Sequence, residues 1–388
     1  MTIEITDQRQ QKTEHRPSAE QIQVRVVDSD VHPTPKRGEL EEFIPAPYQQ
    51  LFRLRSKGAG GQNYYDAPDY ANVYAMRADT FPDDGNFAGS DPAMMFRQVI
   101  MEAGSDLIIL GPLNGSGQTD EEAHALSVAT NRWQDSCWLD AEHNWHQRYR
   151  GSIAAAIQLP HEAAREIEHW AGHPLMSQVL IYAEPRPAWG HPKYDPIWRA
   201  ATRNNLPVAC HLGRGQHNEL PMSPVGFMTY NHDLMVSYSM LAANQVMSLI
   251  FDGVFDRFPT LQIVLIEHAF NWILPLMWRM DAMYEARGPE NGLKRKPSEY
   301  VKDHIWFTTQ PLDYPEDKLE LTKALEWMEG DKILLFSSDY PHWTYDDPQW
   351  VAKHIPASMR EKIMFGNGID VFHLPSTVPA LPGQKRAF

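Results

Sequence analysis

The sequence of 388 residues is poor in cysteine, with Cys137 and Cys210 as its only two. This argues against a disulfide framework and fits a reducing compartment. The sequence also lacks a run of about 18 apolar residues, so it offers no candidate for a membrane-spanning helix. Residues 1–21 are polar and lack the apolar stretch of a secretory signal. We therefore expect a cytoplasmic protein.

Basic residues are also scarce. The chain has 35 Lys and Arg against 50 Asp and Glu, which gives a formal net charge of −15 at pH 7. An acidic surface repels polyanions, so nucleic acid and anionic membranes are not expected as partners. Hydrophobic residues make up 43% of the chain, enough for the core of a large domain.

The sequence pattern alternates between apolar, β-branched runs and helical segments. The strand candidates are residues 22–33, 106–110, 151–159, 178–183, 207–213, 262–270, 304–310 and 332–342. The helical segments are 93–104, 120–145, 160–171, 194–205, 230–257, 271–286, 317–330 and 348–374. Eight such strand–helix units predict a (β/α)8 TIM barrel. An open doubly wound sheet is the alternative, weakened because no G-x-G-x-x-G follows the first strand.

One barrel domain is expected over residues 22–375, between polar tails at 1–21 and 376–388. Residues 34–91 show no regular period and are rich in Pro, Gly and Tyr. The segment is too long for a simple connection, so we interpret it as a lid inserted after the first strand. Its tyrosines either line a pocket or pack the segment against the barrel.

Metal-binding residue types stand where four strands end: Asp30-x-His32, then His211 in PVACHLG, His268 in IVLIEHAF and Asp339 in SSDYPHW. Residues two apart in a strand point the same way, so the first pair can hold one ion. The carboxyl ends of all barrel strands meet at one face. Nitrogen and oxygen ligands without thiolate suit Zn²⁺, Mn²⁺ or Fe²⁺. Each residue alone could be structural, but together they predict a metal centre.

In this order, these residues resemble the amidohydrolase superfamily, and specifically its amidohydrolase-2 branch. The resemblance covers roughly residues 24–375 and includes LMWRMD after the sixth strand and MFGNGIDVF near the end. The branch contains non-oxidative decarboxylases of aromatic and muconic-type acids, hydratases and many hydrolases. The resemblance implies a metal-dependent barrel enzyme and leaves the reaction open.

The resemblance implies Asp30, His32, His211 and Asp339 as metal ligands. It implies His268 as an acid or base that meets the substrate or a metal-bound water, a role that Asp339 can share. The chain departs from the decarboxylases that open with His-x-His or Glu-x-His, because it has Asp-x-His.

Two-metal amidohydrolases carry a carboxylated lysine after the fourth strand. This chain has Glu184 there and no lysine, so we expect a single divalent ion. A second ion bridged by Glu184 is the alternative, as in a two-iron, thioesterase-like relative. Glu184 could equally pair with Arg186 or another cation.

Two reactions fit such a centre. In hydrolysis, a metal-bound water attacks an amide, ester or thioester carbonyl while His268 or Asp339 moves the proton. In decarboxylation, the same residues protonate a ring carbon as CO₂ leaves. The Asp-x-His opening and the aromatic lid lead us to expect hydrolysis of a bulky apolar acid derivative, with decarboxylation as the alternative. A third hypothesis, a binding barrel without catalysis, is disfavoured because all five key positions are occupied.

Four more residues are candidate substrate contacts: Arg77, Arg214, His217 and His342. The arginines could hold a substrate carboxylate and the histidines could orient ligands. Each could instead be an ordinary surface or loop residue. The expected partners are a small-molecule substrate and, because relatives are commonly oligomers, further copies of this chain. The helix in NWILPLMWRMDAMY packs on the barrel or forms a subunit interface.

Overall fold

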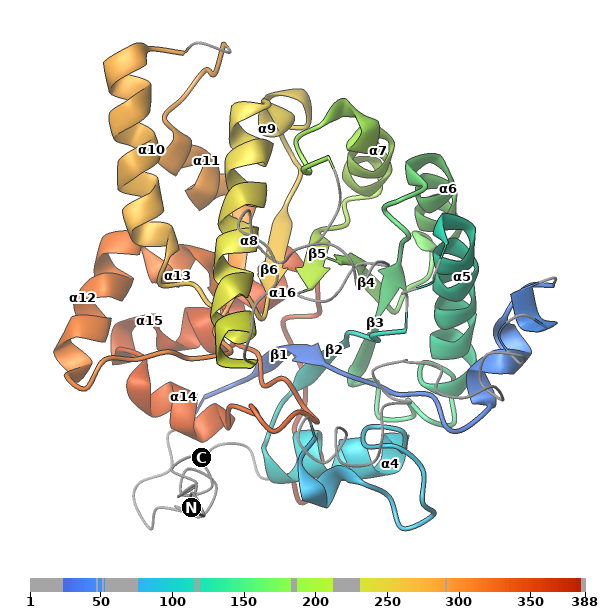
Figure 1. The fold of residues 1–388 in the computed structure, drawn as a ribbon. Helices are drawn as coiled ribbons and strands as arrows, with labels where there is room; N and C mark the ends of the chain where they lie inside the picture. The colour runs from blue at the N-terminus through green and yellow to red at the C-terminus, as the bar shows by residue number, and fades with distance from the viewer. Residues whose placement is uncertain are drawn as a thin grey trace, which may run out of the picture.

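The computed structural model describes residues 24–46, 48–50, 52, 76–114, 117, 119–182, 187–211, 231–289 and 292–384. Its eight strands pair in parallel and in chain order, and the helices lie outside them (Figure 1). The strands are β1 Val27–Val31, β2 Leu107–Leu110, β3 Tyr149–Ala154, β4 Met176–Tyr182, β5 Val208–His211, β6 Ile263–Ile266, β7 Ile305–Thr308 and β8 Leu334–Leu335. The predicted (β/α)8 barrel is confirmed.

Most of the outer helices lie between consecutive strands. They are α4 Pro92–Met95, which continues into η3 Phe96–Glu102, then α5 Asp120–Cys137, α6 Pro160–Trp170, α7 Asp195–Arg203, α8 Asn231–Phe251, α9 Val254–Arg257, α10 Ile273–Arg287, α11 Pro297–His304, α12 Lys318–Met328 and α13 Gly330–Ile333. The chain ends with α14 Pro348–His354, α15 Ala357–Glu361, η5 Lys362–Gly366 and α16 Asn367–Val371. Short helical turns also occur at η1 Glu39–Phe43, η2 Ala78–Thr80 and η4 Pro192–Tyr194. No helix in these described ranges is both long and apolar enough to cross a membrane.

Several predicted elements are shorter than expected, and for two of them the local cause is visible. The helix predicted over 120–145 ends at Cys137, because Asp140 accepts the backbone N–H of His143 and starts a turn instead. The strand predicted over 332–342 is regular only at Leu334–Leu335, since α13 occupies its first residues. Beyond it, Asp339 has a φ of 63°, which no strand residue adopts.

The first and last strands close the barrel through single bonds rather than a regular ladder. The backbone N–H of Ser29 donates to the carbonyl of Phe336 at 3.0 Å. Further along, His32 donates to Tyr340 at 2.7 Å, and Asp339 donates to Asp30 at 3.1 Å. This seam therefore places three of the predicted metal ligands side by side.

The barrel interior is filled by apolar side chains from six strands. The C-terminal segment closes the end of the barrel at which the strands begin. The strand residues in this cluster are Val27, Leu107, Ile109, Leu180, Ala209, Val264, Ile266 and Leu335. Phe372 and Leu374, which follow α16, pack into the same cluster. A polar site inside the barrel is thereby confined to the end at which the strands finish.

Residues 34–91, predicted as a lid, are described at both ends but not over 53–75. The N–H of Thr34 donates to the carbonyl of Gly89, and that of Arg77 to the carbonyl of Pro341, both at 2.9 Å. Both described ends are thus held beside the loop that follows β8. The function of the segment as a lid stays a prediction.

Candidate metal centre

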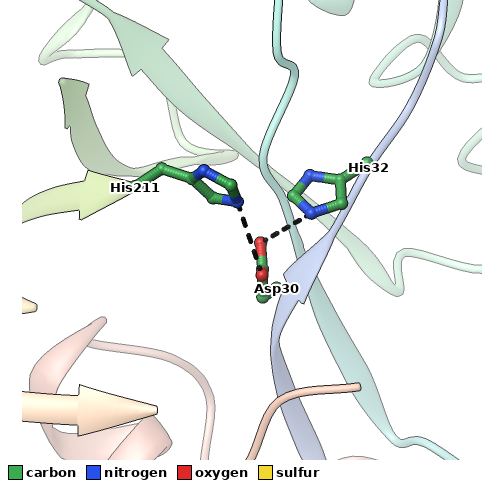
Figure 2. A group of neighbouring side chains, drawn as sticks. All are labelled: Asp30, His32 and His211. Atoms are coloured by element: carbon green, nitrogen blue, oxygen red, sulfur yellow. Dashed lines mark ion pairs between the residues drawn. The ribbon is translucent and has the colours of Figure 1, made fainter. Parts of the chain in front are cut away.

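Two strand ends bring three of the predicted ligands into one buried group. β1 supplies Asp30 and the adjoining loop supplies His32, while β5 ends on His211 (Figure 2). Nε2 of His32 lies 3.4 Å from Oδ1 of Asp30, and Nε2 of His211 lies 3.7 Å from Oδ2. All three side chains are at most 2% exposed. One carboxylate therefore faces two imidazoles away from water.

These separations fit two ligands of a common ion. Bonds of 2.0–2.2 Å at tetrahedral angles place neighbouring ligand atoms about 3.3–3.6 Å apart. Neither carboxylate oxygen of Asp30 has a hydrogen-bond partner among the described residues. A buried carboxylate left in that state is costly, and a divalent cation would satisfy it. The donor set fits the metal that the sequence predicts.

His32 is held in the tautomer that a metal requires. Its Nδ1–H donates to the carbonyl of Gly111 at 2.6 Å, which directs Nε2, the nitrogen that would bind a metal, toward the carboxylates. The position of Gly111 tolerates no side chain easily, because a Cβ there would lie 3.2 Å from Oδ1 of Asp30. The strand end at β2 thus serves the ligands of β1.

Asp339 forms a second group with His32 and His342, from the loop after β8. Its Oδ1 lies 3.1 Å from Nε2 of His32 and 2.5 Å from Nδ1 of His342. Its Oδ2 accepts hydrogen bonds from Nε2 of Gln310 at 3.0 Å and from the hydroxyl of Thr344 at 2.5 Å. The structure therefore places His342, a predicted substrate contact, directly on a predicted metal ligand.

His268 follows β6 and is buried, as predicted for the residue that meets the substrate. Neither ring nitrogen forms a hydrogen bond of normal geometry with a described residue, although the backbone carbonyls of Tyr238 and Cys210 lie close enough to raise the pKa of the imidazole. The pKa of His268 is lowered to about 3, mainly by burial and in smaller part by the neighbouring His211. The imidazole is neutral at pH 7 and free to accept or donate one hydrogen bond.

Glu267 is the site residue that sequence reasoning missed. Its Oε2 lies 3.6 Å from Nε2 of His211, and its side chain is buried. The available signal was the pair Glu267-His268 at a strand end, but strand alternation directs two consecutive side chains to opposite faces. The backbone escapes that rule because Glu267 has a φ of 62° and Ala269 a φ of 55°. Such values in non-glycine residues concentrate at functional sites.

Burial and mutual charge set the ionisation of the centre. Burial alone would raise the pKa of Asp30, but His32 and His211 outweigh it and lower the pKa below its usual value. Burial would lower the pKa of His32, but Asp30 and Asp339 raise it well above 6.5. Burial, with Asp339 and Asp30, raises the pKa of Glu267. The carboxyl groups of Asp30, Asp339 and Glu267 thus lie close together, and this concentration of acidic groups favours a bound cation.

A fourth carboxylate lies beneath the centre. Burial raises the pKa of Asp28 to about 7, although the backbone N–H of Ser338 donates to its Oδ1 at 2.9 Å. Asp28 is two residues before Asp30 on β1 and ties this strand to the segment that carries Asp339. Its role is thus to join the two sides of the seam.

Of the remaining predicted residues the structure describes Arg77, which lies near the loop after β8. The guanidinium of Arg77 pairs with Asp79 at 2.6 Å and lies 4.4 Å from the ring centre of Tyr345. Its contact with substrate stays a prediction. Glu184, Arg214 and His217 lie outside the described residues, so the second ion and the other substrate contacts also stay predictions.

A parallel eight-stranded barrel with buried carboxylate and imidazole side chains gathered at its strand ends is the arrangement typical of metal-dependent barrel enzymes. The amidohydrolase family model, Amidohydro_2, matches residues 27–374, and the chain belongs to this family. A gamma-resorcylate decarboxylase from Polaromonas sp. (strain JS666 / ATCC BAA-500) is 26% identical over 242 residues, which cover 58% of this chain and 71% of that protein.

Two solved structures share the fold. The amidohydrolase map2389c from Mycobacterium avium subsp. paratuberculosis K-10 is 20% identical, with a TM-score of 0.67 over 92% of this chain and 99% of that one. A 5-carboxyvanillate decarboxylase from Novosphingobium aromaticivorans DSM 12444, complexed with manganese, is also 20% identical, with a TM-score of 0.64 over 90% and 96% of the two chains. At these identities the likeness establishes the barrel.

Proposed function

We propose that this protein is a metal-dependent, non-oxidative decarboxylase of an aromatic carboxylic acid. The observation that carries the proposal is the match to a gamma-resorcylate decarboxylase over 71% of that protein, together with the ligand set at the strand ends. A solved relative with the same fold is a decarboxylase complexed with manganese and a nitrobenzoic acid. A divalent metal and a small aromatic acid are thus the expected cofactor and substrate.

The relatives support decarboxylation better than the hydrolysis expected from the sequence. That expectation gave weight to the Asp-x-His opening in place of Glu-x-His. The difference is one methylene group, and either residue supplies a carboxylate oxygen to the same ion. Asp30 faces both His32 and His211 in the structure, so the shorter side chain reaches the position a ligand needs.

Asp30, His32, His211 and Asp339 would hold the ion. A bound divalent cation supplies positive charge for the substrate's carboxylate and a neighbouring hydroxyl oxygen. The burial of these ligands excludes water, which strengthens every charge interaction in the site.

The reaction needs one proton at the ring carbon that loses its carboxylate. The C–C bond breaks, its electron pair stays with the ring carbon, that carbon takes the proton, and CO₂ leaves. Asp339 is the proposed donor, because Nδ1 of His342 lies 2.5 Å from its Oδ1 and can return a proton to it. His268, neutral and without a full hydrogen bond, is placed to accept one from a substrate hydroxyl.

The test is CO₂ release from metal-loaded protein supplied with 2,6-dihydroxybenzoate or 5-carboxyvanillate, alongside hydrolysis of aryl esters of similar acids. In D₂O, the aromatic product should carry one deuterium at the vacated ring position. His211→Ala should abolish the release. Ester hydrolysis without CO₂, lost in the same variant, would instead establish the hydrolase.

A further inference from the structure

A cavity of about 260 Å³ lies at the end of the barrel opposite the candidate metal ligands. It is lined by the beginnings of β3 and β4, by residues 204–206 ahead of β5, and by the C-terminal residues 372–375. The metal ligands stand where strands end, whereas these residues stand where strands begin. The cavity is therefore separate from the proposed active site.

Arg150, the second residue of β3, lines this cavity and is 8% exposed. Its Nη1 donates to the carbonyls of Gln147 at 3.0 Å and Tyr149 at 2.9 Å. Over the described ranges, no carboxylate forms an ion pair with Arg150, and its Nε and Nη2 donate no hydrogen bond. The guanidinium thus faces this cavity without a paired carboxylate among these residues.

The electrostatics of the surroundings add to this imbalance. Burial lowers the pKa of Arg150, and the positive charge of Arg148 lowers it further. An arginine nevertheless remains charged in proteins, because its guanidinium holds its proton strongly. A bound anion would pair with this charge and so stabilise this end of the barrel.

The other lining residues indicate what kind of anion fits. Ser177 and Asn205, which carry a hydroxyl and an amide, are among the lining residues, and such groups can add hydrogen bonds to an oxyanion. Met176, Leu206 and Phe372 present carbon surface. The volume equals that of about nine waters, at ~30 Å³ each, which suits a small molecule.

We propose that this cavity binds a small organic carboxylate, with its carboxylate on Arg150 and its apolar part against Met176, Leu206 and Phe372. A planar guanidinium matches a carboxylate in two parallel hydrogen bonds. The bound molecule joins β3 to the C-terminal segment that closes the barrel. This site is independent of the reaction at the metal centre.

The test is a titration of the full-length, metal-loaded protein with benzoate, followed by calorimetry. His211→Ala removes the contribution of the metal centre and should leave the proposed binding intact. Arg150→Gln should weaken it at least tenfold. Arg203→Gln is the matched control, because it removes an exposed arginine of nearby α7 that pairs with Glu168, and it should bind as the wild type does.

A second measurement holds even where Arg150→Gln fails to fold. Wild-type crystals soaked in 4-bromobenzoate should show an anomalous bromine peak beside Phe372, with the carboxylate on Arg150. Bromine found solely at the metal centre, or at neither place, overturns the proposal, as does unchanged affinity in Arg150→Gln. Inorganic phosphate seated on Arg150 where bromobenzoate does not bind would overturn the organic part and leave a simple anion site.

Discussion

Oε2 of Glu267 lies 3.6 Å from Nε2 of His211, the same nitrogen that faces Asp30 at 3.7 Å. His211 therefore stands between two acidic side chains, one from β1 and one from the loop after β6. Burial raises the pKa of Glu267, and the charges of Asp339 and Asp30 raise it further. A divalent cation bound to His211 would be stabilised by this additional carboxylate.

Replacing Glu267 with Gln should weaken metal binding. The amide keeps the shape but removes the carboxylate beside His211, and loss of a residue that contacts a ligand typically costs 10–100-fold in affinity. We expect about a tenfold loss, measured by competition with a chelator at pH 7. Glu320→Gln, an exposed change on α12, is the control. Equal affinity in the two variants would contradict a role for Glu267.

His211→Ala should remove metal and activity together, because His211 would supply a direct bond to the ion. Metal content by elemental analysis, in moles per chain, measures the first effect and CO₂ release the second. About one equivalent of metal is expected in the wild type. A variant that keeps both full metal content and full turnover would refute the assignment of His211.

His268→Ala should separate the two effects. His268 contacts no described metal ligand through a full hydrogen bond, so most of the metal should remain. Turnover should fall on the order of 10²–10⁴-fold, the usual effect of losing a group that exchanges protons or hydrogen bonds with the substrate. The measurements are metal content and kcat on one preparation. Parallel loss of metal would move His268 among the ligands.

The protein should lose stability as the pH falls from about 6.5 to 4, partly through His146. The pKa of His146 is lowered to about 4, mainly by burial and in smaller part by the positive charge of Arg148. The unfolded chain then binds more protons than the folded one over this window, so the contribution is present above pH 6.5 and lost below it. Its size is on the order of 2 kcal/mol.

Urea unfolding at pH 7 and pH 4.5 measures this effect. His146→Gln removes the titrating group, so the difference in free energy of unfolding between the two pH values should shrink relative to the wild type. His161→Gln, on the first turn of α6, is the control and should leave the difference unchanged. An identical pH dependence in all three proteins would exclude His146 as the cause.

The barrel, and the grouping of the candidate ligands at its strand ends, could be predicted because both follow from short-range patterns. The two-residue period of a strand places Asp30 and His32 on one side, and a buried strand ending in Cys210-His211 presents its last side chain at the barrel mouth. Each prediction needed only the local sequence. The oligomeric state had no such pattern and stays a prediction.

Glu267 and Arg150 could not be predicted, because their roles depend on contacts across the fold. The side chain of Glu267 points inward because its φ is 62°. A glutamate seldom adopts this value by itself, so the surrounding structure must impose it. The isolation of Arg150 is visible only once the C-terminal segment covers the start of β3. A charged residue in a strand gives no sign of whether an acid will lie opposite it.

Because candidate metal ligands meet at the seam between β1 and β8, metal binding would depend on the completion of folding. His32 and Asp339 are 307 residues apart in sequence, yet their side chains meet across this seam. Joining them requires closing a loop of nearly the whole chain, which is among the slower steps of folding. An unfinished chain, or one clipped ahead of Asp339, lacks at least one of the four predicted ligands. Metal binding through these residues would therefore require the finished barrel, and a bound metal would in turn hold the two ends of the chain together.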